Sequence, residues 1–229
     1  MFTSYVDTPA ASEFERVRIR YAQQEYIMPN DDINHLLTNN DEAKQLGRPQ
    51  LSKAEAWQGL KWKAEKPENY IPVKESVIVP DSRKPTEYGE TFTRLTVQPS
   101  FATGELVLVK EDIHIYEKEK KIFFLGREVD LVEAKKYLKQ ANENMLIEKP
   151  ALFNVEHAVA GSDEMPIATW RMVRLSDVDP NEENEAKRIL RIRNLVESDK
   201  GATIYLQTIR QLNSEAVARV NVISNKKTD

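Results

Sequence analysis

The sequence predicts an α+β fold, in which a mostly antiparallel sheet with one packed helix follows an extended, proline-punctuated N-terminal arm and precedes a C-terminal helical pair. Three observations predict it. Seven of the 11 prolines fall in residues 1–90, strand patterns dominate residues 91–175, and two helical patterns follow in residues 176–229. We therefore expect an arm with short local elements over 1–90, a β-rich core with one helix over 91–175, and a helical hairpin packed on that core over 176–229.

Two local elements are expected in the arm. Residues 16–21 alternate arginine with Val, Ile and Tyr, which favours a strand, although residues 13–24 also fit a helix. Ser52 and Glu55 have the spacing of a capping box, in which each side chain satisfies the other residue's backbone N–H. The box predicts a helix that ends before Pro67.

The core region holds most of the strand patterns. Asp130 and Glu133 predict the start of its helix, because an N-cap acid followed three residues later by Glu satisfies free backbone donors. Gly126 closes a hairpin whose turn is charged. The expected strands cover residues 92–97, 105–109, 113–116, 122–125, 152–160 and 167–175.

The C-terminal region predicts two helices. Asp179 is a favourable N-cap and Pro180 suits the first helical position, so the first helix should run to about Glu197. The second helix should begin near Thr203. Over residues 218–222, Ala and Val alternate with polar residues, so the end of this helix could instead be a strand.

Composition excludes several classes of protein. Cysteine is absent, which removes disulfides, thiolate nucleophiles and cysteine-ligated metals. No two of the seven glycines lie closer than 12 positions, whereas phosphate-binding loops and the nucleophile elbow of serine hydrolases need glycines within about six positions. The net charge of −4 provides no general attraction for nucleic acid.

Hydropathy argues against export and against a membrane span. The longest apolar runs, such as residues 106–109 and 122–125, have about four residues, and a membrane helix needs about 20. The first 30 residues contain no continuous apolar stretch of the kind found in signal peptides. We expect a protein that is not secreted, does not engage a membrane, and is located in the cytoplasm or in a particle assembled there.

Two clusters of acidic residues have spacings that could bind a metal ion. Asp177, Asp179 and Asn181 are spaced like the start of a calcium loop, but Glu182 and Arg188 occupy the positions that require Gly and Glu. Capping of the following helix explains these acids.

The second cluster consists of Asp31, Asp32 and His35, which could share one helix face and bind a divalent metal in an enzyme. A capped helical turn with a solvated histidine explains this cluster more simply. A role as metal ligand is disfavoured for His157 as well. His114 is expected to be an outward polar residue of a hairpin strand. No metal and no cofactor are therefore predicted.

The segment from Trp57 to Lys63 mixes aromatic and basic side chains. Packing against the body of the chain or against a partner subunit is favoured for Trp57, Leu60 and Trp62, because aromatic residues are enriched at interfaces. Stacking on single-stranded nucleic acid, with Lys61 and Lys63 on phosphates, is the alternative. A basic helix stripe could extend that second surface; it consists of Lys187, Arg188 and Arg191.

These observations predict a non-enzymatic assembly or protein–protein interaction protein, of the kind found in virus or phage particles. Its partner would be another protein or a second copy of the chain, and its contact patch would be Trp57, Leu60 and Trp62. The alternative is a nucleic-acid-binding accessory protein that uses the aromatic, basic segment and the basic stripe. A third hypothesis is an enzyme with carboxylate-based or metal-assisted chemistry around Asp31, Asp32 and His35.

Overall fold

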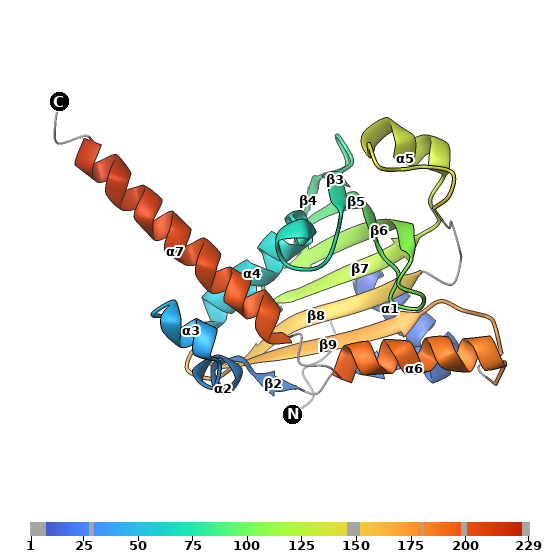
Figure 1. Cartoon of the computed structure of the whole chain (residues 1–229), viewed down its shortest axis with the longest axis horizontal. Helices are drawn as coiled ribbons and strands as arrows, with labels where there is room; N and C mark the ends of the chain where they lie inside the picture. The colour runs from blue at the N-terminus through green and yellow to red at the C-terminus, as the bar shows by residue number, and fades with distance from the viewer. Residues whose placement is uncertain (1–7, 28–29, 146–151, 180, 198–200, 226–229) are drawn as a thin grey trace.

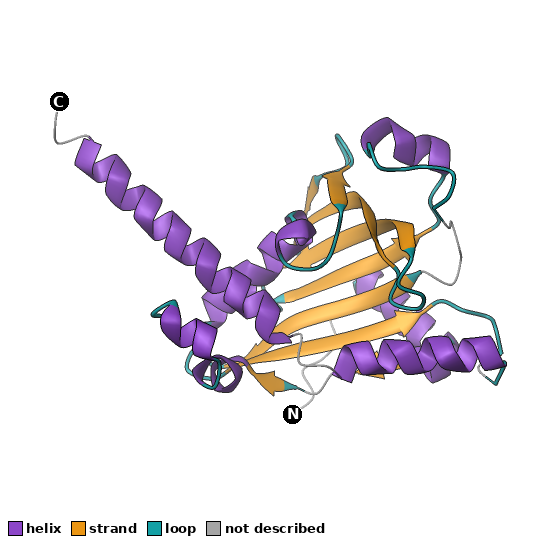
Figure 2. Cartoon of the chain, in the orientation of Figure 1, coloured by secondary structure: helices purple, strands orange, loops and turns teal. Residues whose placement is uncertain are grey.

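One antiparallel sheet organises the chain (Figures 1 and 2). The structure, a computed structural model, describes residues 8–27, 30–145, 152–179, 181–197 and 201–225. In these residues the sheet has nine strands, in the order β1-β9-β8-β7-β6-β5-β3, with β2 also pairing with β9 and β4 with β5. The strands are β1 (Glu25–Ile27), β2 (Asp31–Asp32), β3 (Glu75–Ile78), β4 (Lys84–Thr86), β5 (Gly89–Pro99), β6 (Leu106–Tyr116), β7 (Lys121–Arg127), β8 (Phe153–Gly161) and β9 (Pro166–Arg174).

Helices cover both faces of this sheet. They are α1 (Pro9–Arg20), α2 (Ile33–Thr38), α3 (Asp41–Gln45), α4 (Lys53–Glu65), α5 (Leu131–Tyr137), α6 (Glu183–Glu197) and α7 (Gly201–Asn225). Figure 1 shows α4, α6 and α7 in front of the sheet and α1 behind it. We call these two sides the α4 face and the α1 face. No helix in the described part of the chain is long and apolar enough to cross a membrane.

The α4 face carries the largest apolar core. Strand residues that alternate with the opposite face, among them Ile113, Ile122 and Val155, pack against Trp57 and Leu60 of α4. Residues from α7 and α6, including Ile209 and Ile192, join the same core. On the α1 face, one smaller core forms beneath α1 and another beneath α5. The α+β class and the large antiparallel sheet are thus confirmed.

The N-terminal region is a structural part of the sheet in its described residues. Strands β1 and β2 pair with β9, and β3 and β4 pair with β5, so this region supplies both edges. The strand expected over residues 16–21 is wrong and the helical alternative is correct. Thr8 caps α1 through a 3.3 Å bond from Ala11 N–H to its Oγ1, and Pro9 occupies the first turn.

The capping box before α4 is confirmed. Ser52 Oγ accepts from the backbone N–H of Glu55 at 3.3 Å, and Glu55 Oε2 accepts from the backbone N–H of Ser52 at 2.9 Å. Asp130 caps α5 with its carboxylate, which accepts from Val132 N–H at 2.9 Å, but Glu133 pairs with Lys110 and the predicted reciprocal bond is not formed. These two local signals were readable because neighbouring residues complete them.

The C-terminal region differs from expectation in detail. Helix α6 begins at Glu183, after a turn in which Asp179 accepts from the backbone N–H of Asn181 at 2.9 Å; Pro180 lies outside the described residues. Helix α7 continues to Asn225, so a strand over 218–222 is wrong. Figure 1 shows α6 along the β9 side of the α4 face, while α7 crosses α4 and then extends away from the sheet.

Candidate functional site

Polar side chains interrupt the apolar surface of the α4 face. Strand alternation places Arg94 on β5, Glu111 on β6 and His157 on β8 among apolar neighbours of that face. Strand pairing sets Arg94 opposite Glu111 and His157 opposite Trp170. The sheet therefore brings together residues that are far apart in sequence, and all of them lie beneath the helices.

Helix α4 adds a lysine to this group. Lys63 is only 6% exposed, and its Nζ lies 3.0 Å from Nε2 of His157, which is 5% exposed. The same Nζ is 5.4 Å from the ring centroids of both Phe124 and Trp170. We call this group the Lys63 cluster; its members are Lys63, Arg94, Glu111, Phe124, His157 and Trp170.

The aromatic members enclose the imidazole. The His157 ring stacks on Trp170 with centroids 4.7 Å apart and an interplanar angle of 26°. Phe124 meets the same imidazole edge-on at 5.5 Å. Such contacts hold the ring orientation and keep its surroundings apolar.

Arg94 fixes the position of α4 relative to the sheet. Its Nη1 donates to the carbonyl oxygens of Lys63, at 3.3 Å, and Ala64, at 2.6 Å. Its Nη2 donates to Glu111 Oε2 at 2.5 Å. The guanidinium thus satisfies carbonyls at the C-terminal end of α4, where a positive charge is favourable, and holds the Lys63 backbone in place.

Burial changes the protonation of the cluster. Burial, followed by repulsion from Arg94, lowers the pKa of Lys63 to about 7, against an opposing attraction from Glu111. Burial, and then the charges of Lys63 and Arg94, lowers the pKa of His157 well below its ordinary value. Two adjacent buried cations would repel each other, so near neutral pH the Lys63–His157 contact holds one proton at most between the two.

Two donors of the cluster have no acceptor. Within the described residues, the buried Arg94 Nε–H and Trp170 Nε1–H lack any hydrogen-bond partner. A buried donor without a partner costs about 1–3 kcal/mol, so proteins rarely keep one without a reason. Both belong to side chains that contact the Phe124–His157 ring pair directly. An oxygen-bearing ligand at the cluster would supply the missing acceptors.

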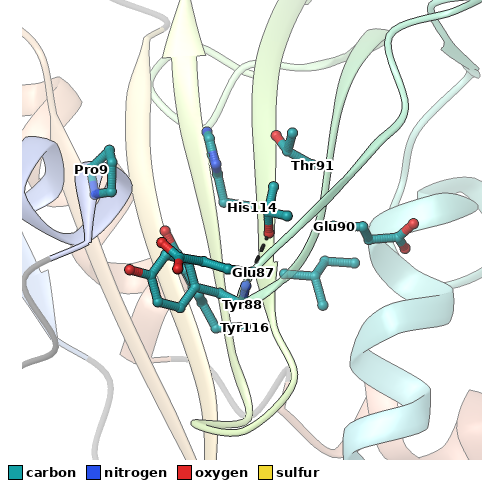
Figure 3. A pocket seen from close by; sticks show the side chains of 9 residues that line it. Pro9, Glu87, Tyr88, Glu90, Thr91, His114 and Tyr116 are labelled. Atoms are coloured by element: carbon teal, nitrogen blue, oxygen red, sulfur yellow. Dashed lines mark hydrogen bonds between the residues drawn. The ribbon is translucent and has the colours of Figure 1, made fainter.

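A second candidate lies on the α1 face, where a pocket of about 410 Å³ opens between the N-terminus of α1 and the β4–β5 hairpin (Figure 3). The Tyr88 and Tyr116 rings meet edge to face at 5.3 Å, and His114 and Thr91 stand beside them. Burial lowers the pKa of His114. Because His114, Tyr88 and Thr91 are only partly buried, this pocket lacks the dry, strongly shifted groups of the Lys63 cluster, which is the stronger candidate for chemistry.

The predicted contact patch lies largely inside the chain. Trp57 and Leu60 are 3% and 2% exposed and belong to the core of the α4 face, and Trp62 packs partly buried against it. The indole N–H of Trp57 donates to Glu117 Oε2 at 2.8 Å. A contact between this patch and a partner stays a prediction, and the packing alternative accounts for the burial of Trp57 and Leu60.

The predicted basic residues do not form one surface. Lys61 pairs with Glu117 at 2.9 Å at the surface of α4, whereas Lys63, two residues on, is buried. On α6, Lys187 pairs with Glu183 at 2.6 Å and Arg188 approaches Glu185 at 3.6 Å. Arg191 leaves that stripe and packs its guanidinium against Gly104. Figure 1 places α4 and α6 over different parts of the sheet.

The acidic cluster near residue 31 is explained by capping. Asp32 accepts from the backbone N–H groups of Asn34, at 2.9 Å, and His35, at 3.2 Å, at the start of α2. Throughout the part of the chain that the structure describes, no three His, Asp or Glu side chains are grouped so that they could hold a metal ion. His157 is buried, because strand alternation directs it to the α4 face.

Sequence reasoning missed the Lys63–His157 contact because the partners lie on α4 and β8. A weak signal was present. His157 alternates with Val155 and Val159, and Arg94 alternates with Phe92, so each polar residue falls on an apolar strand face. A buried polar residue in such a position is informative, but its partner requires the fold.

Comparisons with known proteins give one extensive match and several weak ones. The family model described as "AtaL: Acetylaranotin biosynthesis cluster protein L" matches residues 38–216. No curated protein matches the sequence.

Solved structures with some likeness include the di-domain ARO/CYC BexL from the BE-7585A biosynthetic pathway, at 9% identity and a TM-score of 0.49, over 87% of this chain and 54% of that one. The Zhui aromatase/cyclase from Streptomyces sp. R1128 has 9% identity and a TM-score of 0.45, over 74% of this chain and 89% of that one. A START superfamily protein from Mycobacterium smegmatis has 10% identity and a TM-score of 0.43, over 71% and 92%. The chain spans about half the length of the first, and nothing about function follows from these weak likenesses.

Proposed function

The chain belongs to the AtaL family, described as acetylaranotin biosynthesis cluster protein L, and from that premise we propose that it binds and acts on a small-molecule intermediate of a biosynthetic pathway at the Lys63 cluster. The matched region includes α4, most of the sheet and the part of α7 that packs on it. Every member of the Lys63 cluster lies within that region.

This membership corrects the function expected from composition. A family named for a biosynthesis cluster is at odds with a structural component of a virus or phage particle and with a nucleic-acid-binding accessory protein. The composition was misleading because scarce histidine and absent cysteine exclude particular chemistries only. A buried lysine, one histidine and an arginine are sufficient for acid–base chemistry on a small molecule.

The observation that carries the proposal is the contact between Lys63 Nζ and His157 Nε2, 3.0 Å apart inside an aromatic enclosure. Two titratable groups that share one proton can take a proton from a ligand and return it. Because the pKa of Lys63 is lowered to about 7, its protonated and neutral forms are both populated near neutral pH.

The surroundings define the class of ligand. Phe124 and Trp170 surround Lys63 Nζ with aromatic carbon, which suits a mostly apolar ligand. Arg94 Nε–H and Trp170 Nε1–H would donate to its oxygen atoms. A carbonyl oxygen suits these donors, and negative charge that develops on it as a neighbouring carbon loses a proton would be stabilised by Arg94. We therefore propose acid–base catalysis next to a carbonyl group.

Cyclohexanone is a suitable probe, because it is small and apolar and has exchangeable protons next to its carbonyl. We expect it to shift the NMR signal of the Trp170 indole N–H in a saturable manner, and the protein to accelerate exchange of those protons in D₂O. Lys63→Met should abolish the acceleration. A general acid–base group typically raises the rate by about 100-fold or more. The matched control is Lys61→Met, on the same helix but outside the cluster, which should behave like the unmodified protein. No indole shift and no acceleration above Lys63→Met would refute the proposal.

A further inference from the structure

We infer that Lys63 binds its ligand covalently, as an imine between Nζ and the ligand's carbonyl carbon, with the 3.0 Å neighbour His157 moving the protons. The inference rests on the proposed function, because it requires a carbonyl compound at the Lys63 cluster. It goes further in making the lysine a nucleophile and the product a covalent adduct.

The environment of Lys63 favours a neutral amine. Among the described residues, no carboxylate lies within salt-bridge distance of its Nζ, and the nearby carboxylate of Glu111 is held by Arg94. Lys61, two residues earlier, pairs with Glu117 at 2.9 Å and keeps an ordinary partner for its ammonium group. The same helix therefore carries one lysine suited to attack and one suited to a salt bridge.

The lowered pKa of Lys63 supports this difference. At pH 7 about half of the Lys63 side chains would carry a free lone pair, since their pKa is lowered to about 7. Desolvation of a lysine in an apolar pocket beside another cation is an established way to activate its amine. Arg94 is that cation in this cluster.

The reaction balances without a co-reactant. The Nζ lone pair forms a bond to the carbonyl carbon while the C=O π electrons move to oxygen. One amine proton passes through His157 Nε2 to that oxygen, which gives a carbinolamine. The second amine proton follows the same route to the hydroxyl group, water leaves, and the nitrogen lone pair completes the C=N bond. Both protons end on the water that departs, and hydrolysis reverses the sequence.

A buried N–H donor without a partner suits the step in which the carbonyl oxygen gains negative charge. As the carbonyl carbon becomes tetrahedral, its oxygen gains negative charge before it is protonated. The indole N–H of Trp170, whose ring stacks on His157, has no partner among the described residues and would donate to that oxygen. Its role is electrostatic, and it contacts the reacting oxygen rather than the nitrogen.

Reductive trapping tests the inference on the full chain. The protein is incubated with cyclohexanone and sodium cyanoborohydride at pH 7, and the peptides are mapped by mass spectrometry. We expect one cyclohexyl group on Lys63 and at least tenfold less on Lys61. Lys61→Met should retain the adduct, and Lys63→Met should lose it. His157→Gln should slow trapping about tenfold or more, because the imidazole no longer moves the protons.

The outcomes separate covalent capture from simple binding. Cyclohexyl groups spread over exposed lysines, or none on Lys63, would overturn the inference. If Lys63 is unmodified while the Trp170 indole signal still shifts and exchange is still accelerated, the imine fails and the proposed function stands. If neither trapping nor the indole shift is seen, both fail. Selective modification of Lys63 that depends on His157 supports the imine, since burial alone would protect the lysine from reagent.

Discussion

Gly59 of α4 lies directly against Thr208 of α7: a Cβ atom built on Gly59 would overlap the Thr208 hydroxyl and lie 2.9 Å from its Cβ. The two helices cross where neither has a large side chain to separate them. Lys63 follows Gly59 by one turn and so lies on the same side of α4. Helix α7 therefore contacts α4 one turn before Lys63.

Gly59→Ala should destabilise the protein. The added methyl group has no space at the crossing, and overpacking of this kind costs about 1–3 kcal/mol. Urea-induced unfolding would measure the loss. In the double variant Gly59→Ala with Thr208→Ala we expect partial recovery, because the clashing hydroxyl and methyl are gone. If Gly59→Ala is as stable as the unmodified chain, the crossing is looser than the structure indicates.

The stability of the protein should rise between pH 7 and pH 9. The pKa of Lys63 is lowered from 10.5 to about 7 in the folded state, so over this window the unfolded chain binds the extra proton. Folding stability then increases with pH by at most about 1.4 kcal/mol per pH unit. The pKa of His157 is lowered well below its ordinary value, so this imidazole does not titrate in the window.

Variants isolate that pH dependence. Urea unfolding at pH 7, 8 and 9 should show the increase for the unmodified protein and for Lys61→Met. Lys63→Met should be nearly flat across the same range, because a thioether side chain does not titrate. Parallel slopes for all three proteins would mean that Lys63 keeps an ordinary pKa.

The ion pair between Arg174 and Glu185 should hold α6 on the sheet. The two side chains are 0% and 1% exposed, and Gln24 and Ser176 also donate to the carboxylate. Burial alone would raise the pKa of Glu185, but hydrogen bonds and attraction from Arg174 outweigh it and the pKa is lowered. Glu185→Gln would leave Arg174 buried without its countercharge, at a cost of about 3–5 kcal/mol.

Hydrogen exchange would localise that effect. Amide protons of α6 should lose protection in Glu185→Gln before those of β6 and β7, which lie in the middle of the sheet. The double variant Arg174→Met with Glu185→Leu removes both charges and should regain much of the stability. Uniform loss of protection across the sheet would show that α6 does not open separately.

Trp57→Ala should destabilise the chain by about 3–5 kcal/mol, because it removes a buried indole from the core of the α4 face. The thermal midpoint of the variant and of the unmodified protein should be independent of protein concentration over a tenfold range. An intermolecular role for this tryptophan predicts the reverse, since the stability of an obligate dimer depends on its concentration. Light scattering on the same samples would give the oligomeric state.

Local signals in the sequence predicted much of the fold. The capping box at Ser52 and the β6–β7 hairpin were readable because the residues that form them are neighbours in sequence. Helix α1 was left open between two patterns, since alternating arginines resemble a strand. Thr8 as the N-cap and Pro9 in the first turn favour the helix, and Ala10 and Phe14 pack it against the sheet.

The candidate site was harder to predict because it is assembled from distant strands. Lys63 was read together with Lys61 as part of a basic surface, and nothing local distinguishes the two lysines. Their difference depends on Glu117, which reaches Lys61, and on His157, which reaches Lys63. Such partners are set by strand order, and single-sequence patterns do not encode that order directly.

The pairing of β1 with β9 has a consequence for synthesis on the ribosome. Residues 25–27 find their strand partners at residues 171–173, which are made last in the sheet. At about 5–20 residues per second, the first strand waits on the order of ten seconds with its backbone unpaired. Over that time an exposed edge can pair with the wrong segment or with another nascent chain. We expect the need for chaperones during synthesis to increase with the time that β1 remains unpaired before β9 is made and pairs with it.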